Sequence, residues 1–343
     1  MREATITLLG LAMSVAMRPA AAEASSDIRD YDLLVTSAAA AKGSVRDGIY
    51  RFDPTTGRLE GAFGCGAEIR DPRGVRLAPD RSFVLVNNGD DRILKFEAGS
   101  GKFLGSLSFR PGLNPGGGKF GWDGRYYVGS RSEKSIVAFD VAGEGEPSIF
   151  VPGSFVKFPR GLAASASGAM YVASGTHPTT GEGQNTILRF DRSGRLDESF
   201  KVNDPGLSPL DIEVSPSGNL LSASEVPFGD ANAITTVREY DKLTGNLVRV
   251  FDAGGSPDGQ RVSKLPRGIT IGPDGALYSS GADNVVRYDL QTGRFDRREP
   301  GHSRAIDHLR SETFSALRPI DGQRCGTEEL RNPEPECRRF STA

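Results

Sequence analysis

The chain has 343 residues, of which 42 are Lys or Arg and 44 are Asp or Glu, so its formal net charge is −2. This balance argues against a nucleic-acid-binding protein, which normally carries a basic surface. After the N-terminal region, no apolar run reaches the ~18–20 residues of a membrane-spanning helix. Glycine accounts for 43 of the 343 residues, about 12.5%, which is well above the average share of ~7%. This excess indicates many tight turns between short strands.

Residues 1–24 have the order of features that is typical of a secretory signal peptide. A basic start is followed by an apolar stretch over residues 4–17 and then by small residues in an Ala-x-Ala arrangement. A buried N-terminal helix is disfavoured because Pro19 would end it. We therefore expect cleavage after Ala22 or Ala24 and an exported protein, either periplasmic or extracellular.

An aromatic-acidic pair recurs through the chain at intervals of 43 to 51 residues. The six copies are Phe52-Asp53, Phe96-Glu97, Phe139-Asp140, Phe190-Asp191, Tyr240-Asp241 and Tyr288-Asp289. All but the third are followed by Thr-Gly or Ser-Gly. In a tight hairpin the glycine supplies a positive φ, and the acidic side chain accepts hydrogen bonds from turn amides. The repeat therefore predicts a hairpin in each of six units.

A second phrase precedes the pair in the last five units. The phrase is Pro-Arg-Gly in the copies that begin at Pro72, Pro159 and Pro266. The copies that begin at Pro115 and Pro209 match it less well. A Gly-containing turn and an apolar strand follow each copy. Four short strands per unit, separated by turns, are typical of a propeller blade. The sequence thus predicts an all-β fold over residues 25–319, a six-bladed β-propeller with four-stranded blades.

The first unit lacks this second phrase, because residues 32–36 resemble the second strand of the other units. A ring with an unfilled inner position would expose unpaired strand edges. We therefore expect a C-terminal strand near residues 312–317 to fill the position and close the seam. Residues 305–309 are also compatible with a helix, so this assignment stays open.

The three cysteines are Cys65, Cys325 and Cys337, and export would favour pairing. Residues 320–343 form a Cys-containing tail that is rich in Pro, Glu and Arg. A Cys325–Cys337 disulfide would close a short loop in this tail, and we favour that pairing. The alternative is that Cys65 ties the tail to the body of the protein. No Cys-x-x-Cys motif supports a zinc knuckle or a haem attachment site.

The phrases Pro-x-Gly-[Ile/Val], Pro-Asp-Gly, Leu-Tyr-Val and [Arg/Lys]-[Phe/Tyr]-Asp resemble those of NHL-type six-bladed propellers over about residues 31–300. Within that superfamily, the chain is most similar to the virginiamycin B lyase and regucalcin/gluconolactonase branches. The resemblance implies the fold. For these branches it also implies a metal-dependent lyase, or a hydrolase of lactones and esters.

The same resemblance implies that the catalytic residues are not retained. The lyase branch has His before the Gly of the phrase, and the regucalcin branch holds a divalent metal with Asp and Asn residues. Arg73, Arg160 and Arg267 stand at the equivalent places of this chain. Three positive charges would repel a cation, so we lean against enzymatic activity.

The repeat alignment brings the starts of the inner strands and the loops after the second strands to one rim. The ligand-binding candidates on this rim are Arg73, Arg160, Arg267, Asn88, Arg131 and Asp211. Three guanidinium groups at equivalent positions would converge on the channel mouth and bind a carboxylate, phosphate or sulfate. The open alternative is that each Arg pairs with carbonyl or carboxylate groups of a neighbouring blade.

Two further sets of residues are candidates for chemistry. His177 lies in a long loop near Glu182 and is a candidate general base. A shifted site for Ca²⁺ or another divalent metal would use Asn87, Asp90, Asp211 and Glu225. No cofactor is expected otherwise.

The sequence therefore predicts an exported binding module for an anionic small molecule, glycan or peptide. We expect this module to be a monomer that binds no nucleic acid and has no membrane-spanning segment. One alternative is a secreted metal-dependent hydrolase or lyase with a shifted site. A second alternative is a protein-interaction scaffold. Trp122 and the aromatic residues of the strands are expected to fill the spaces between blades.

Overall fold

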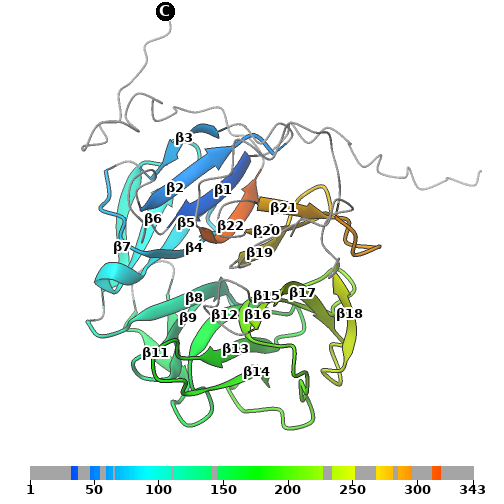
Figure 1. Ribbon diagram of the computed structural model, residues 1–343. Coiled ribbons are helices and arrows are strands. Elements are labelled where there is room, and N and C mark those ends of the chain that lie inside the picture. Colours follow the sequence, from blue (N-terminus) through cyan, green and yellow to red (C-terminus); the bar gives the residue numbers. More distant parts are fainter. Residues whose placement is uncertain are drawn as a thin grey trace, which may run out of the picture.

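The computed structural model describes residues 32–37, 47–54, 59–64, 66–109, 111–140, 145–226, 234–251, 268–280, 285–295 and 311–317. Within these ranges the regular elements are strands, apart from one short 3₁₀ helix, η2 (Asn88–Asp90). The strands form six antiparallel sheets, four with four strands and two with three. Figure 1 shows the sheets arranged around a common centre. The all-β prediction is confirmed.

The first three sheets have four strands each. The first has the order β22 (Ser311–Leu317), β1 (Asp32–Ser37), β2 (Gly48–Phe52), β3 (Leu59–Phe63). The second has the order β4 (Pro72–Leu77), β5 (Ser82–Asn87), β6 (Arg92–Glu97), β7 (Phe103–Phe109). The third has the order β8 (Pro115–Phe120), β9 (Tyr126–Ser130), β10 (Ser135–Phe139), β11 (Ser148–Val151).

The last three sheets follow the same order from the centre outwards. The fourth has β12 (Pro159–Ala164), β13 (Met170–Thr176), β14 (Gly183–Phe190). The fifth has β15 (Pro209–Val214), β16 (Leu220–Val226), β17 (Ile234–Tyr240), β18 (Leu247–Phe251). The sixth has β19 (Gly268–Ile271), β20 (Leu277–Ser280), β21 (Val285–Tyr288).

The inner strands contact one another in ring order, which Figure 1 lets the reader follow. β4 contacts β8, β8 contacts β12, β12 contacts β15 and β15 contacts β19. β22 contacts both β19 and β4, and it pairs with β1 in the register Leu33↔Ala316 and Leu34↔Ser315. A C-terminal strand therefore lies at the inner position of the first sheet. Residues 305–309 lie outside the described residues.

The aromatic-acidic pair has the predicted role in the turns. Asp241 Oδ1 accepts hydrogen bonds from the backbone N–H groups of Leu243 at 3.0 Å and Thr244 at 2.8 Å. Asp289 accepts equivalent bonds from its own turn amides. The glycine that follows, Gly245, has a φ of 78°, a left-handed conformation that disfavours other residues. The prediction is confirmed at these turns.

The aromatic members of the six pairs form much of the core. Phe52, Phe96, Phe139, Phe190, Tyr240 and Tyr288 are all at most 4% exposed. Each such side chain stabilises the fold by roughly 1.5–3 kcal/mol when fully buried. Trp122 packs in the cluster between the third and fourth sheets, with its ring centroid 5.8 Å from that of Tyr127. The prediction that Trp122 fills a space between blades is confirmed.

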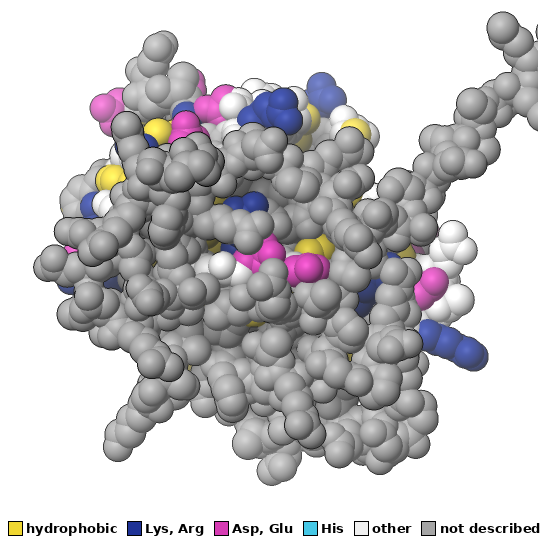
Figure 2. Space-filling view, turned by 90° about the horizontal axis from the view of Figure 1, so that it is seen from above, with side chains coloured by type: hydrophobic (Ala, Val, Ile, Leu, Met, Phe, Trp, Pro, Cys, Tyr) yellow, Lys and Arg dark blue, Asp and Glu magenta, His cyan; other side chains and the backbone are white. Residues whose placement is uncertain are grey.

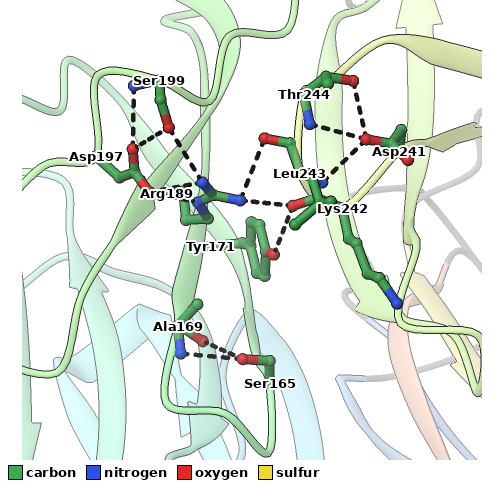
Figure 3. A network of polar contacts seen from close by, with 10 residues as sticks. All are labelled: Ser165, Ala169, Tyr171, Arg189, Asp197, Ser199, Asp241, Lys242, Leu243 and Thr244. Carbon is green, nitrogen blue, oxygen red and sulfur yellow. Dashed lines mark hydrogen bonds and ion pairs between the residues drawn. The ribbon is translucent and has the colours of Figure 1, made fainter.

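Arginines near the turns join neighbouring sheets, as Figure 3 shows for Arg189 of β14. Arg189 Nη1 donates to the carbonyl of Lys242 in the next sheet at 2.6 Å, and Nη2 donates to Asp197 Oδ2 at 2.6 Å. Arg249 of β18 repeats this pattern with the carbonyls of Leu290 and Gln291. These contacts link adjacent sheets.

Several sequence predictions concern residues beyond the described ranges. They are the signal peptide at residues 1–24, the tail at residues 320–343, and all three cysteines, Cys65, Cys325 and Cys337. None of the helices in the described part of the chain has the length and apolar character needed to cross a bilayer. Figure 2 shows that basic and acidic side chains are intermixed among the described residues on the face that it draws.

Candidate functional site

The strand registers define two faces of the molecule. The first residue of an inner strand pairs with the end of the second strand in Pro72↔Asn87, Pro115↔Ser130, Pro159↔Ser174 and Pro209↔Ser224. The inner-strand starts and the loops after the second strands therefore share one face, which we call the mouth face. The opposite face carries the turns between third and fourth strands, such as residues 240–247, and we call it the turn face.

Arg73 and Asn88 lie together on the mouth face of the second sheet. Arg73 Nη2 forms an ion pair with Asp71 Oδ2 at 2.5 Å, and Asn88 Nδ2 donates to the same oxygen at 3.1 Å. The backbone N–H of Asp71 donates to Asp47 Oδ2 at 2.6 Å. An anionic ligand at this point would have to compete with the resident carboxylate of Asp71.

Arg131 and Arg160 lie together around Phe158, at the junction of the third and fourth sheets. The guanidinium carbon of Arg131 is 5.1 Å from the centroid of the Phe158 ring, and that of Arg160 is 5.4 Å away. The imidazole of His177 meets the same ring edge-on, with centroids 5.1 Å apart. We call Phe158, Arg131, Arg160 and His177 the Phe158 cluster. Arg267 lies outside the described residues.

His177 is built into its own loop. Its Nδ1 atom accepts hydrogen bonds from the backbone N–H groups of Thr179 at 3.1 Å and Thr180 at 3.2 Å. A neutral imidazole has one acceptor nitrogen and one N–H donor, so in the neutral ring the proton is on Nε2. The lone pair that a general base needs is thus engaged by the turn. This geometry supports a structural or donor role for His177 more than proton abstraction.

Asp211 lies at the centre of the molecule and joins three inner strands. Its carboxylate, 2% exposed on β15, accepts from Arg76 Nη2 of β4 at 3.2 Å and from the Ile269 N–H of β19 at 3.1 Å. Arg76 and Asp211 come from the second and fifth sheets, which are opposite in the contact order of the inner strands. Lys119 of β8 adds a second ion pair with Glu213 of β15 at 2.7 Å. The central charges are therefore matched across the ring.

Burial and charge shape the titration of this central group. Burial raises the pKa of Asp211, and the positive charge of Arg76 opposes that rise. Burial also disfavours the charged form of Arg76, but the carboxylates of Asp211 and Glu213 outweigh it and raise the pKa of the guanidinium. Tyr126 is fully buried beside the pair, and its hydroxyl has no hydrogen-bond partner among the described residues. Burial raises the pKa of this phenol.

The sequence contained a signal for the central ion pairs that we missed. Arg76, Lys119 and Glu213 each stand four residues after the first Pro of the second phrase, a position that Ala163 and Thr270 occupy in other units. Asp211 stands where the phrase otherwise has Gly. Charged residues at a repeated inner-strand position indicate contacts at the centre. Phe158 was missed because it precedes the phrase.

The candidate metal ligands do not fit a shared cation site. Asn87 uses Oδ1 to accept from the Arg70 N–H at 2.7 Å and Nδ2 to donate to Asp90 Oδ1 at 2.6 Å. Asp90 also pairs with Arg92 at 2.5 Å. Asp211 is paired with Arg76, and Glu225 is fully buried in β16 of the fifth sheet. Among the described residues, no three His, Cys, Asp or Glu side chains are grouped to hold a metal.

No protein-family model matches the sequence, and no curated protein matches it. Solved structures do match. A chain of a nidogen/laminin complex aligns at 13% identity over 85% of this chain and 99% of that chain, with a TM-score of 0.60. A catalytically inactive virginiamycin B lyase from Staphylococcus aureus with quinupristin aligns at 14% identity over 85% and 96%, with a TM-score of 0.54. A streptogramin B lyase aligns at 17% identity over 70% and 73%, with a TM-score of 0.50.

The chain has a β-propeller fold similar to the folds of these structures. These likenesses confirm the resemblance expected from the repeat phrases. The matched propellers include lyases and a member of a protein complex, so the shared fold leaves the chemistry of this propeller to its own site residues.

Proposed function

We propose that the six sheets are the blades of a closed, six-bladed propeller and that the protein is exported. The contact order of the inner strands and the pairing of β22 with β1 support closure. The features of residues 1–24 support export. Closure by the C-terminal strand would leave no unpaired inner edge at the first blade.

We further propose that this propeller is a binding module for an anionic ligand at its mouth face. The observation that carries the proposal is the convergence of Arg131 and Arg160, from adjacent sheets, on one partly exposed ring. The Arg76–Asp211 and Lys119–Glu213 ion pairs occupy the centre beneath this face. A ligand is therefore expected to bind at the surface of the mouth face rather than deep along the axis.

The donor chemistry favours binding over metal-dependent hydrolysis or elimination. The polar atoms of Asn87, Asp90 and Asp211 are engaged by other groups of the protein. If these atoms bound a cation, the Arg76–Asp211 ion pair would have to break. Breaking a buried ion pair is strongly destabilising, because it leaves a buried charge without its partner. The guanidinium groups of the mouth face suit carboxylate, phosphate or sulfate instead.

The test is calorimetric titration of the purified full chain with acetate, phosphate and sulfate. We expect the Arg131→Ala/Arg160→Ala variant to lose about tenfold or more in affinity, because charge-assisted hydrogen bonds are lost. The Arg249→Ala variant is the control, since it removes a similar guanidinium contact on the turn face. Equal binding by all three proteins would contradict the proposal.

Metal analysis of the same preparation, with a screen of lactones and esters, tests the rival enzyme. If the protein contains a stoichiometric divalent metal and turns over one of these substrates, it is a hydrolase or lyase and the binding-module proposal is wrong. A protein-interaction scaffold is the second candidate, because the nidogen/laminin complex contains a propeller of similar fold. Specific capture of one exported protein that is insensitive to Arg131→Ala/Arg160→Ala would favour this scaffold.

A further inference from the structure

We infer that His177 is a pH-dependent anchor of the mouth-face loop at residues 177–182, which is closed while the imidazole is neutral and opens when the imidazole is protonated. This loop joins β13 to β14 in the fourth sheet. The inference goes beyond the proposed function, because it concerns the shape of the mouth face and holds whatever binds there.

The side chain of His177 accepts hydrogen bonds from the backbone of its own loop. Nδ1 accepts from the N–H groups of Thr179 at 3.1 Å and Thr180 at 3.2 Å. The main chain closes around the ring, since the N–H of His177 donates to the Glu182 carbonyl at 2.7 Å and the N–H of Gly181 donates to the His177 carbonyl at 3.0 Å. The imidazole is therefore the acceptor for two amides at the tip of the loop.

These two bonds require an unprotonated Nδ1. A neutral imidazole has a lone pair on one ring nitrogen, whereas an imidazolium carries a proton on both nitrogens and accepts no hydrogen bond. Turning the charged ring over would not restore the bonds, because its other nitrogen is also a donor. Imidazole groups change charge between about pH 5 and pH 8. Because the open loop can bind this proton and the closed loop cannot, a falling pH shifts the equilibrium towards the open loop.

Glu182 is the acidic group of the loop that would attract a protonated His177, and it already has a partner. Its Oε1 accepts from Lys134 Nζ at 2.6 Å. The pKa of Glu182 is lowered, first by this hydrogen bond and with smaller effects from the charges of Lys157 and His177. The carboxylate can therefore attract the imidazolium only in competition with Lys134. The other charged groups near the imidazole are basic and lie around Phe158, whose ring meets it edge-on; they are Arg131, Arg160 and Lys157.

The contacts on either side of the loop confine the opening to its tip. Thr176 of β13 pairs with Gly183 of β14, and this backbone pairing has no titratable member. The Thr176 carbonyl also accepts from Arg160 Nη2 at 2.6 Å, and a guanidinium keeps its charge. A fall from about pH 8 to about pH 5 should therefore expose the amides of Thr179 and Thr180 and leave the amides of β13 and β14 protected.

The experiment measures amide hydrogen exchange of the full chain by NMR at about pH 8 and about pH 5. Each rate is divided by that of an unstructured peptide at the same pH, because exchange itself slows in acid. We expect the protection of the Thr179 and Thr180 amides to fall about tenfold or more on acidification, since two hydrogen bonds are lost. The midpoint should coincide with the titration of the His177 imidazole.

Two variants separate the imidazole from the other groups of the loop. In His177→Asn, the side-chain oxygen can accept from the same amides, as asparagine does in turns. This oxygen does not titrate, so the protection should be equal at both pH values. In Glu182→Gln, the change in protection should remain, because Glu182 is not the group that takes up the proton.

The outcomes decide the inference without reference to anion binding. Unchanged protection of the two amides while the His177 imidazole titrates would overturn it, as would an equal fall in His177→Asn or the loss of the transition in Glu182→Gln. If His177→Asn shows no protection at either pH, the wild type decides. A midpoint that follows the imidazole then supports the inference, and a midpoint that follows another group contradicts it.

Discussion

The two faces of this propeller use arginine in different ways. On the turn face, Arg189 and Arg249 each bind a carboxylate of their own sheet and two carbonyls of the next sheet. On the mouth face, Arg160 Nη2 donates to the Thr176 carbonyl of its own sheet, and Arg131 lies with Arg160 over the ring of Phe158. Arg189 and Arg249 therefore connect neighbouring sheets, whereas Arg131 and Arg160 bring two guanidinium groups to one aromatic ring.

This difference separates stability from binding within one repeated scaffold. The turns repeat the same acid, hydroxyl and glycine from sheet to sheet, as Asp241 and Asp289 show. The positions that face the mouth vary instead, with Asn88, Arg131 and Glu225 each standing one residue after the partner of the first Pro of an inner strand. Residues that recur in every unit make contacts that each unit of the fold needs. Residues that differ between units are found where a function is usually added to a rigid scaffold.

The largest expected effect concerns the buried Arg76–Asp211 ion pair at the centre of the molecule. Asp211→Ala leaves the buried Arg76 without its carboxylate and removes the acceptor of the Ile269 amide. We expect a loss of about 3–5 kcal/mol in the free energy of unfolding, measured by urea denaturation.

A matched double variant tests the cause of that loss. Arg76→Met/Asp211→Gly removes both charges and restores the Gly of the repeat phrase. It should be clearly more stable than Asp211→Ala, because no unpaired charge is left in the interior. A double variant as unstable as the single one would show that the ion pair is not the source of the effect.

The second prediction compares one arginine from each face. Arg249→Ala removes an ion pair with Glu239 at 2.5 Å and two bonds to carbonyls of the sixth sheet, so we expect it to cost about 2 kcal/mol. Arg131→Ala should cost less, about 0.5–1 kcal/mol for its cation–π contact with Phe158, but weaken anion binding. Denaturation and calorimetry of both variants check this. A reversed result would remove the distinction between the faces.

The third prediction concerns acid unfolding. Burial alone would raise the pKa of Asp274 on the turn face, but hydrogen bonds from Arg287 and from the Ala276 amide lower it below its ordinary value. The pKa of Asp80 is lowered to about 2, where bonds from Lys95 and Ser82 outweigh burial. For such groups the unfolded chain binds protons first as the pH falls. Stability should therefore be lost from about pH 4 towards pH 2.

Variants from the two faces sharpen this pH dependence. Asp274→Asn should flatten the loss of stability between pH 4 and pH 2, because its two-bond contact with Arg287 no longer titrates. Glu182→Gln on the mouth face should leave the curve nearly unchanged, since Glu182 and its partner Lys134 are well exposed. The melting temperature at each pH is the measurement, and a flattened curve for Glu182→Gln would contradict the assignment.

Local chemistry made the turns predictable, while contacts across the ring did not follow from local patterns. The acid and glycine of each turn lie within five residues, so spacing alone predicts the bonds seen at Asp241. The Arg76–Asp211 pair joins residues 135 apart and requires the whole ring to bring them together. Arg73 pairs with Asp71, two residues away, whereas the alternative to ligand binding had been a partner in a neighbouring blade. The contacts of Phe158 with Arg131 and Arg160 could not be predicted either, because the two arginines come from different sheets that meet at its ring.

The smallest expected effect tests the turns themselves. Thr244→Val removes a side-chain hydrogen bond of 2.9 Å to Asp241 while keeping the shape of the side chain. We expect the melting temperature to fall by about 1–2 °C, and Thr292→Val, which loses the equivalent bond to Asp289, should behave alike. Thr180→Val in the mouth-face loop loses only a long bond of 3.3 Å from the Glu182 amide, so its effect should be smaller still. If it costs as much as Thr244→Val, the mouth-face loop contributes as much to stability as the turns do, and the contrast between the two faces is lost.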